Sequence, residues 1–112
     1  MNLEELYKVI SPVIPNKVFY GTNTYDDTDN ASMPYIVYQE ISKTAIGYSD
    51  NKPIAFRSNI QITLVTKNKD LSYERLLEKT LLDQGINYHL TSEFANSDKS
   101  INRVYEITME KF

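Results

Sequence analysis

Few residues in this 112-residue chain are of a type that does chemistry, and they are scattered along it. The only histidine is His89, and the chain has no cysteine, so neither a histidine–cysteine pair nor a thiolate nucleophile can form. A zinc site needs three or four nitrogen, sulfur or oxygen ligands, and one histidine with dispersed carboxylates does not provide them. We therefore interpret His89 as an ordinary residue of a strand.

Two other kinds of reactive site are also poorly supported. A serine nucleophile on a strand-to-helix turn requires a Gly-x-Ser-x-Gly motif, which is not in the sequence. Gly21, Gly47 and Gly85 are each isolated, so they cannot build a glycine-rich loop that binds phosphate or a dinucleotide. The sequence predicts no catalytic residue, no cofactor and no metal site.

The acidic stretch "DDTDN" resembles half of a calcium-binding loop. Counted from Asp27, positions three and five are Asp29 and Ala31, and the sixth position is Ser32 instead of the required glycine. The twelfth position is Tyr38, where a calcium loop of this type has glutamate. We interpret the stretch as a solvated acidic loop, with an adventitious cation site as the alternative.

The nine tyrosines could form a stacking platform for single-stranded nucleic acid. Such platforms surround their aromatic rings with lysine or arginine, whereas Tyr25 lies among aspartates and Tyr38 precedes Gln39 and Glu40. The net charge is −3 and the basic residues are dispersed, so no basic surface for nucleic acid is indicated. Core and interface tyrosines are the better interpretation.

The elements that would position these residues are two helices and five strands. Leu3, Leu6, Tyr7 and Ile10 have the spacing of one helical face; Asn2 is expected to cap this helix and Pro12 to end it. A second helix is expected across 68–86, capped by Asp70 or Ser72 and ended by Gly85. Strands are expected at 17–21, 35–42 (directly after Pro34), 55–66, 86–91 and 101–112.

This order, α-β-β-β-α-β-β, predicts one α+β domain over residues 1–112. Two helices should pack on one mainly antiparallel sheet of four to five strands. The strand 55–66 alternates most clearly between apolar and polar side chains, so we expect one of its faces to be wet or to contact another subunit. The predicted core residues are Ile60, Ile62, Leu64, Leu76, Leu77, Leu81, Tyr105, Ile107 and Met109.

Three polar segments separate these elements: 22–33, 43–53 and 91–100. Long loops in a compact domain are usually functional or are ordered by a partner, so we expect all three to be mobile in an isolated subunit. The candidate interface residues on them are Tyr25, Asp26, Asp27, Asp29, Tyr48, Asp50, Phe94 and Asp98.

The sequence contains no stretch approaching the roughly 18 apolar residues of a membrane span, and its N-terminus lacks the layout of a signal peptide. We therefore expect a soluble protein made in a reducing cytoplasm, with no membrane partner.

The ordered set of segments resembles the small tail completion, or tail terminator, proteins of bacteriophages with long noncontractile tails. The resemblance covers residues 3–112 and begins with the short helix and the strand "VFYG". The stretch "MPYIVYQEIS" is the most telling part, because proline, an aromatic residue, β-branched residues and Tyr-Gln are typical of the family's second strand. The strand "RSNIQITLVTKN" followed by the helix "SYERLLEKTLLDQG" and the last strand "INRVYEITMEKF" continue the match.

The resemblance implies a structural virion protein without catalytic residues, located at the head–tail interface. Such proteins form a ring, typically a hexamer, that ends polymerisation of the tail tube protein and offers a docking surface to the head connector proteins. DNA would pass through the channel of the ring without specific binding. The alternatives are another head–tail component such as a stopper or adaptor, a phage-encoded protein that binds a host target, and a small enzyme.

Overall fold

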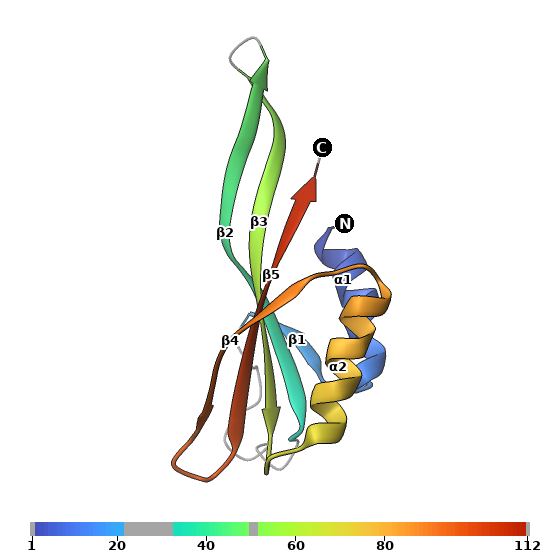
Figure 1. Ribbon diagram of the computed structural model, residues 1–112, viewed down its shortest axis with the longest axis vertical. Coiled ribbons are helices and arrows are strands. Elements are labelled where there is room, and N and C mark those ends of the chain that lie inside the picture. The colour runs from blue at the N-terminus through green and yellow to red at the C-terminus, as the bar shows by residue number, and fades with distance from the viewer. Residues whose placement is uncertain (1, 22–32, 50–51, 112) are drawn as a thin grey trace.

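The computed structural model describes residues 2–21, 33–49 and 52–111 (Figure 1). Two α-helices and five strands occur in the predicted order α-β-β-β-α-β-β, and the α+β class is confirmed. The helices are α1 (Leu3–Ile10), which continues into the short 3₁₀ helix η1 (Ser11–Val13), and α2 (Leu71–Asp83). The strands are β1 (Val18–Tyr20), β2 (Tyr35–Ser49), β3 (Lys52–Thr66), β4 (Tyr88–Ala95) and β5 (Ile101–Lys111).

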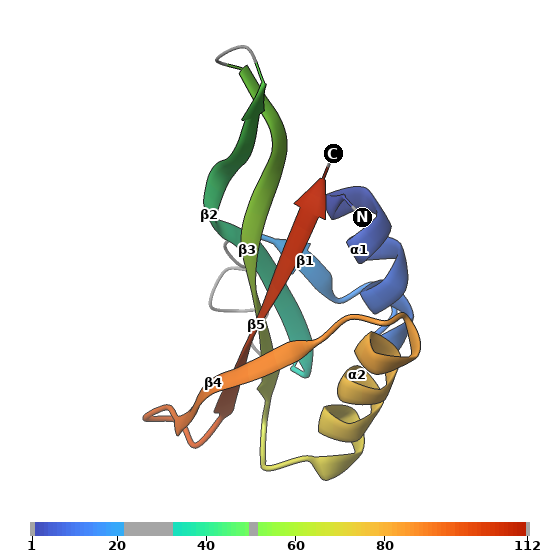
Figure 2. The same cartoon turned by 45° about the horizontal axis from the view of Figure 1, so that its top comes forward.

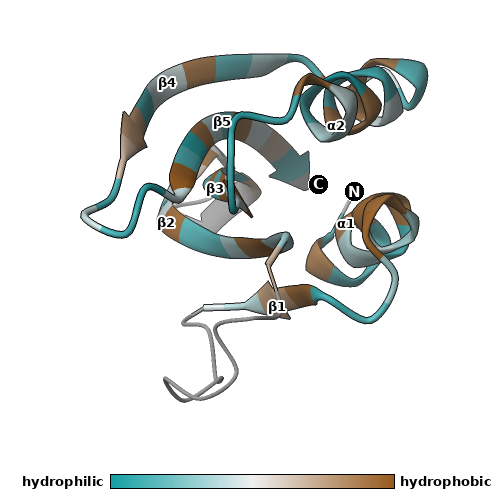
Figure 3. Cartoon of the chain, turned by 90° about the horizontal axis from the view of Figure 1, so that it is seen from below, coloured by the Kyte–Doolittle hydropathy of each residue, from teal (hydrophilic) through white to brown (hydrophobic). Residues whose placement is uncertain are grey.

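The five strands form one twisted sheet in the order β1-β2-β3-β5-β4. β1 is parallel to β2, with Val18 opposite Ile36, and all other neighbours are antiparallel. Both helices lie on the same side of the sheet, which curves around them from β1 to β4 (Figure 3). The molecule is elongated, 53 × 29 × 24 Å, because β2 and β3 extend well beyond the other strands (Figures 1 and 2).

The helix ends follow the predicted capping. The Asn2 side chain accepts a hydrogen bond of 2.8 Å from the Glu5 backbone N–H, and Asp70 accepts from the backbone of Ser72 and Tyr73. Gly85 has φ +72°, the left-handed conformation that glycine adopts most easily after a helix. The α-helix ends at Ile10, just before Pro12, as predicted, and Pro12 lies in the first turn of the short 3₁₀ helix η1, where a proline is tolerated.

The core lies between the helices and the sheet. Leu77 and Leu81 of α2 are fully buried, as is most of the predicted sheet core, and Met109 packs against it while partly exposed. The prediction for Leu76 was wrong: this side chain is 44% exposed, and Glu74 is buried in its place. The buried row of α2 follows positions 74, 77 and 81, which leaves Leu76 on another face of the helix.

The segment 43–53, expected to be a polar loop, is mostly a β-hairpin. β2 continues to Ser49 and pairs with β3 through Thr44 opposite Arg57 and Ile46 opposite Ala55. A bulge at Ile41 separates this part of β2 from its beginning. Pairing with β3 thus provides backbone hydrogen bonds for a stretch whose polar composition suggested a loop.

The expected strand at 86–91 is also longer and lies further along the chain. β4 runs from Tyr88 to Ala95, and only the residues from Asn96 to Ser100 form a connection to β5. That connection is a tight turn, in which the Asn96 N–H donates to the Ser100 carbonyl at 2.8 Å and the Lys99 N–H donates to the Asn96 carbonyl at 2.9 Å. Within the described ranges, neither helix has the length and apolar character needed to cross a membrane.

Candidate functional site

The side of the sheet that faces away from α1 and α2 is covered by no described helix or strand (Figure 3). We call it the uncovered face. The cross-strand register and the alternation of side chains assign to it Gln39, Ser42, Thr44, Arg57, Asn59, Gln61, Thr63, Glu106, Thr108, Glu110 and His89, with apolar residues nearer β1 and the β4–β5 turn. Its polar side chains agree with the prediction that one side of the strand 55–66 is wet or contacts another subunit.

Rows of polar side chains cross this face from strand to strand. In one row Asn59 donates to the Ser42 hydroxyl at 2.8 Å, and its side-chain oxygen accepts from the Thr108 hydroxyl at 3.0 Å. In the next row the Arg57 guanidinium lies 2.9 Å from the Glu110 carboxylate. Cross-strand hydrogen bonds and ion pairs of this kind link neighbouring strands of the sheet through their side chains.

The charge of the uncovered face is low and slightly negative. Among its described residues, Glu106 and Glu110 carry two negative charges, Arg57 carries one positive charge, and no lysine is present. The formal sum is −2 + 1 = −1, and the one arginine is paired. The face can offer hydrogen bonds to a partner, but its described residues provide no free cation for a phosphate.

The hairpin arm, which we define as Ser42–Ser49 and Lys52–Arg57, is the second conspicuous feature (Figure 2). β5 pairs with β3 only as far as Phe56, so beyond that point the arm has two strands. Lys43 lies over the Phe56 ring at 4.8 Å. Isolated two-stranded hairpins are marginally stable in water, so a protruding arm of this kind gains from packing against a partner.

A charged cluster joins α2 to β4 and β5 on the covered face. The Arg103 guanidinium binds Glu78 and Glu93, each at 3.0 Å, and donates to the Tyr105 hydroxyl at 2.6 Å. Lys69 binds Glu93 at 2.6 Å and the buried Glu74 at 2.8 Å. Because Glu74 and Glu78 belong to α2, these bonds hold the helix against β4 and β5. Every buried side-chain nitrogen and oxygen of the described residues has a hydrogen-bond partner.

The pKa values in the cluster are displaced in the directions these contacts dictate. Burial alone would raise the pKa of Glu78, but hydrogen bonds from Tyr105, Tyr88 and Arg103 together lower it. Burial, and then the hydrogen bond to Glu78, raise the pKa of Tyr105. The hydrogen bond from Lys69 is the main cause that lowers the pKa of Glu93. Both carboxyl groups are therefore ionised at neutral pH.

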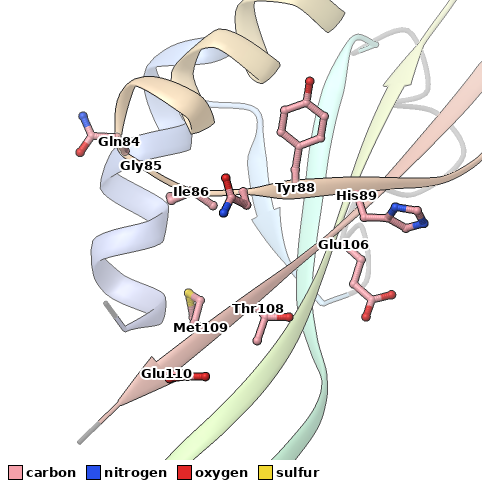
Figure 4. A pocket seen from close by; sticks show the side chains of 10 residues that line it. Gln84, Gly85, Ile86, Tyr88, His89, Glu106, Thr108, Met109 and Glu110 are labelled. Carbon is pink, nitrogen blue, oxygen red and sulfur yellow. The ribbon is translucent and has the colours of Figure 1, made fainter.

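His89 lies at a groove of about 540 Å³ between the end of α2 and the last strands (Figure 4). It stands opposite Glu106 across the β4–β5 ladder, while its neighbour Tyr88 points a different way. Within the described ranges, no group of three or more histidine, aspartate or glutamate side chains could hold a metal ion. The groove thus brings together one imidazole, two carboxylates at Glu106 and Glu110, and a wall of both polar and apolar residues.

A second groove, of about 780 Å³, is lined by aromatic residues of α1, β1 and β2. The Tyr20 and Tyr38 rings meet edge to face at 5.2 Å, and Tyr7 lies 6.3 Å from Tyr38. Burial, and then the two neighbouring hydroxyls, raise the pKa of Tyr38. Tyr20 is 52% exposed, so this groove presents aromatic surface to a partner.

The predicted interface residues are dispersed. Tyr25, Asp26, Asp27, Asp29 and Asp50 lie outside the described residues. The other three are described in part or in full: Tyr48 belongs to β2 in the hairpin arm, Phe94 lies on β4, and Asp98 lies in the β4–β5 turn.

The loop placement of Phe94 was wrong, because β4 pairs with β5 through Phe94 opposite Asn102; its side chain is nevertheless 48% exposed. The Asp98 carboxylate accepts from the Ser100 hydroxyl at 2.6 Å and from its N–H at 3.0 Å. These bonds lower the pKa of Asp98, the Ser100 hydroxyl being the main cause, and make the residue part of the turn itself.

Sequence reasoning missed the Arg103 cluster and the hairpin arm. One signal for the cluster was available, because Arg103 shares the strand face of Tyr105 and Ile107, and a charge on a buried face needs partners. Glu74 and Glu78, one helical turn apart on α2, were the candidates for that pairing. Comparison with protein-family models and with curated protein sequences gives no match for this chain.

Proposed function

We propose that the chain is a structural subunit of a bacteriophage tail, which forms a ring at the end of the tail tube and ends its polymerisation. The ring would offer a docking surface to the head connector proteins, and DNA would pass through its channel. The subunit has no catalytic role in this proposal. It acts through its surfaces.

The uncovered face is the observation that carries this proposal. A channel that passes DNA must be polar enough to be hydrated and must not hold phosphates, because each lysine or arginine that neutralises a phosphate adds affinity. The described residues of this face are mostly amides and hydroxyls, and Arg57 is paired with Glu110. With α1 and α2 on the outside of the ring, this face lines the channel.

The hairpin arm is a second feature that supports the same proposal. A closed ring of identical subunits needs two different surfaces on each copy, one for each neighbour. The arm extends along the long axis of the molecule, beyond the part of the sheet that the helices cover (Figure 1). It can reach an adjacent copy or the next component of the tail.

Electron microscopy of tail tubes tests the proposal. Tail tube protein from the phage that encodes this chain is polymerised with and without the purified chain. The proposal expects added density at one end of each tube, and tubes that stop growing once it binds. Tubes that elongate equally in both samples, with bare ends, would overturn it.

A second candidate is a phage-encoded protein that binds a host target. The tyrosine-lined groove favours it, because exposed tyrosines are enriched at protein interfaces. Light scattering of the chain after its capture from host extract distinguishes the two candidate functions. A host-binding protein should form a stable heterodimer with its target. The ring proposal expects a self-assembly.

A further inference from the structure

Two edges of the sheet are left unpaired by the described strands. At one side, β4 pairs only with β5 among the described strands, and its other edge is open. At the other side, β1 covers β2 only from Ile36 to Tyr38, so no described strand pairs with the outer edge of β2 from Gln39 to Ser49. Open edges present unpaired backbone N–H and C=O groups that invite another strand.

We infer that β4 of one copy pairs with the outer edge of β2 of the next copy, between Ile41 and Gly47, so that the sheet continues from subunit to subunit. This inference rests on the proposed ring and names the contact that builds it. The occupant of each edge is a second copy of this chain.

The strand directions favour that pairing. β2 and β5 run one way, and β3 and β4 run the other. A second copy placed beside the first in the same orientation therefore presents β2 antiparallel to β4. The new pair continues the antiparallel alternation of the sheet.

The charges of the two edges are complementary. Glu93 is the only formally charged residue of β4, and Lys43 is the only one from Ile41 to Ser49 on β2. Both side chains lie on the covered side of their strands, because Glu93 is opposite Arg103 and Lys43 is opposite Ser58. Placing Glu93 beside Lys43 matches the two faces and brings a further cation to a carboxylate that already binds Lys69 and Arg103.

Exposed apolar side chains on the two edges agree with their being covered by a second copy of the chain. Phe94 on β4 is 48% exposed and Ile41 on β2 is 46% exposed. In the register that sets Glu93 beside Lys43, Phe94 comes opposite Ser42 and Ala95 comes opposite Ile41. β4 also lacks the proline and lysine residues with which proteins often block an edge, although it contains one bulge.

The two edges lie at different heights of the sheet, and a tilt of the strands removes this difference. Ser92 is level with Val104, Thr63 and Val37, whereas its proposed partner Thr44 is seven residues beyond Val37, one of them in the bulge. The offset along the strands is roughly 20 Å, and four strand spacings from β2 to the next β2 make roughly 19 Å. Strands tilted by about 45° to the ring axis bring the edges level.

Disulfide cross-linking tests the inference directly, because the chain has no cysteine of its own. The exposed residues Ser92 and Thr44 are replaced together (Ser92→Cys with Thr44→Cys), and the protein is oxidised mildly at a concentration where light scattering reports a ring. We expect covalent multimers up to the full ring, absent from each single variant. The matched control, Ser92→Cys with Ser72→Cys on α2, should stay monomeric on a denaturing gel.

A second variant checks the charge pairing without cysteine. Lys43→Glu should lower the fraction of assembled protein at least several-fold, whereas Lys67→Glu, an exposed lysine away from both edges, should leave it unchanged. Circular dichroism controls for folding. The inference is overturned if a ring forms but neither Ser92→Cys with Thr44→Cys nor Ser92→Cys with Ser42→Cys gives the cross-link; the ring proposal then still stands. A protein that forms no ring overturns both the inference and the ring proposal.

Discussion

The Arg57 guanidinium lies 2.9 Å from the Glu110 carboxylate across the β3–β5 ladder, and this pair neutralises the one arginine of the uncovered face. Both side chains are about half exposed, so the bond adds little to stability. Its consequence is electrostatic, because the face is left without an unpaired cation among its described residues.

We therefore predict that the protein does not bind duplex DNA measurably at about 150 mM salt. Six copies at −3 give a ring charge of −18 (six times −3), which repels phosphates. Glu106→Lys with Glu110→Lys raises the formal charge of each subunit from −3 to +1 and should produce binding that weakens as salt is raised. Fluorescence anisotropy at about 50 and about 150 mM salt measures both; submicromolar affinity of the unmodified protein, with a steep salt slope, would contradict the assignment of this face to the channel.

Ile62 on β3 is fully buried beneath the helices, and Ile62→Ala should lower the free energy of unfolding by about 2–5 kcal/mol. Its neighbour Gln61 points to the uncovered face, so Gln61→Ala should change the free energy of unfolding by less than about 0.5 kcal/mol. Urea denaturation of both variants measures the difference. A small effect at Ile62 and a large one at Gln61 would mean that the two faces of β3 are reversed.

Glu78→Gln tests the charged cluster between α2 and the sheet. The pKa of Glu78 lies below its usual 4.5 in the folded protein, so its carboxylate stabilises the fold above that pH. The contribution is lost as pH falls below 4.5 through the folded-state pKa. At pH 7 the variant should be less stable by about 1–3 kcal/mol, from lost hydrogen bonds to a charged group.

The pH dependence distinguishes this ionic contribution from a simple packing defect. The stability gap between Glu78→Gln and the unmodified protein should narrow as urea denaturation is repeated toward about pH 3. Glu106→Gln, on the uncovered face, serves as the matched carboxylate control. A gap that stays constant over this range would rule out the ionised carboxylate as its source.

Much of this fold follows from local signals. The alternation of β3 located its buried face, Asp70 and Gly85 marked the ends of α2, and Pro34 preceded β2 as expected. These features depend on residues within a few positions of one another. They can therefore be predicted from a single sequence.

The surfaces depend on contacts between residues far apart in the sequence, and these were missed. The stretch after Ser42 is polar and contains Gly47 with φ +68°, so only its pairing with β3 makes it a strand. Arg103 and Glu78 are 25 positions apart and meet only in the folded chain. The acidic loop with Asp27 and Asp29 lies outside the described residues, so its interface assignment stays a prediction.

Hydrogen exchange would follow the hairpin arm during assembly. In dilute protein, the amides of Ser42–Gly47 that point away from β3 should exchange quickly, because no described strand binds them. In the assembled state they should become protected if β4 of the next copy pairs there. Mass spectrometry of the peptide that covers this segment at low and high protein concentration measures the change, and equal exchange in both states would contradict the pairing.

The mass of the protein in solution tests the central claim most directly. Size-exclusion chromatography with light scattering, over a series of concentrations, should reveal a discrete assembly that grows at the expense of the 13.0 kDa monomer. For a hexamer, six times 13.0 kDa is about 78 kDa. A protein that stays monomeric up to the highest concentration, or that stops at a dimer, would contradict the proposal that this chain is a ring subunit.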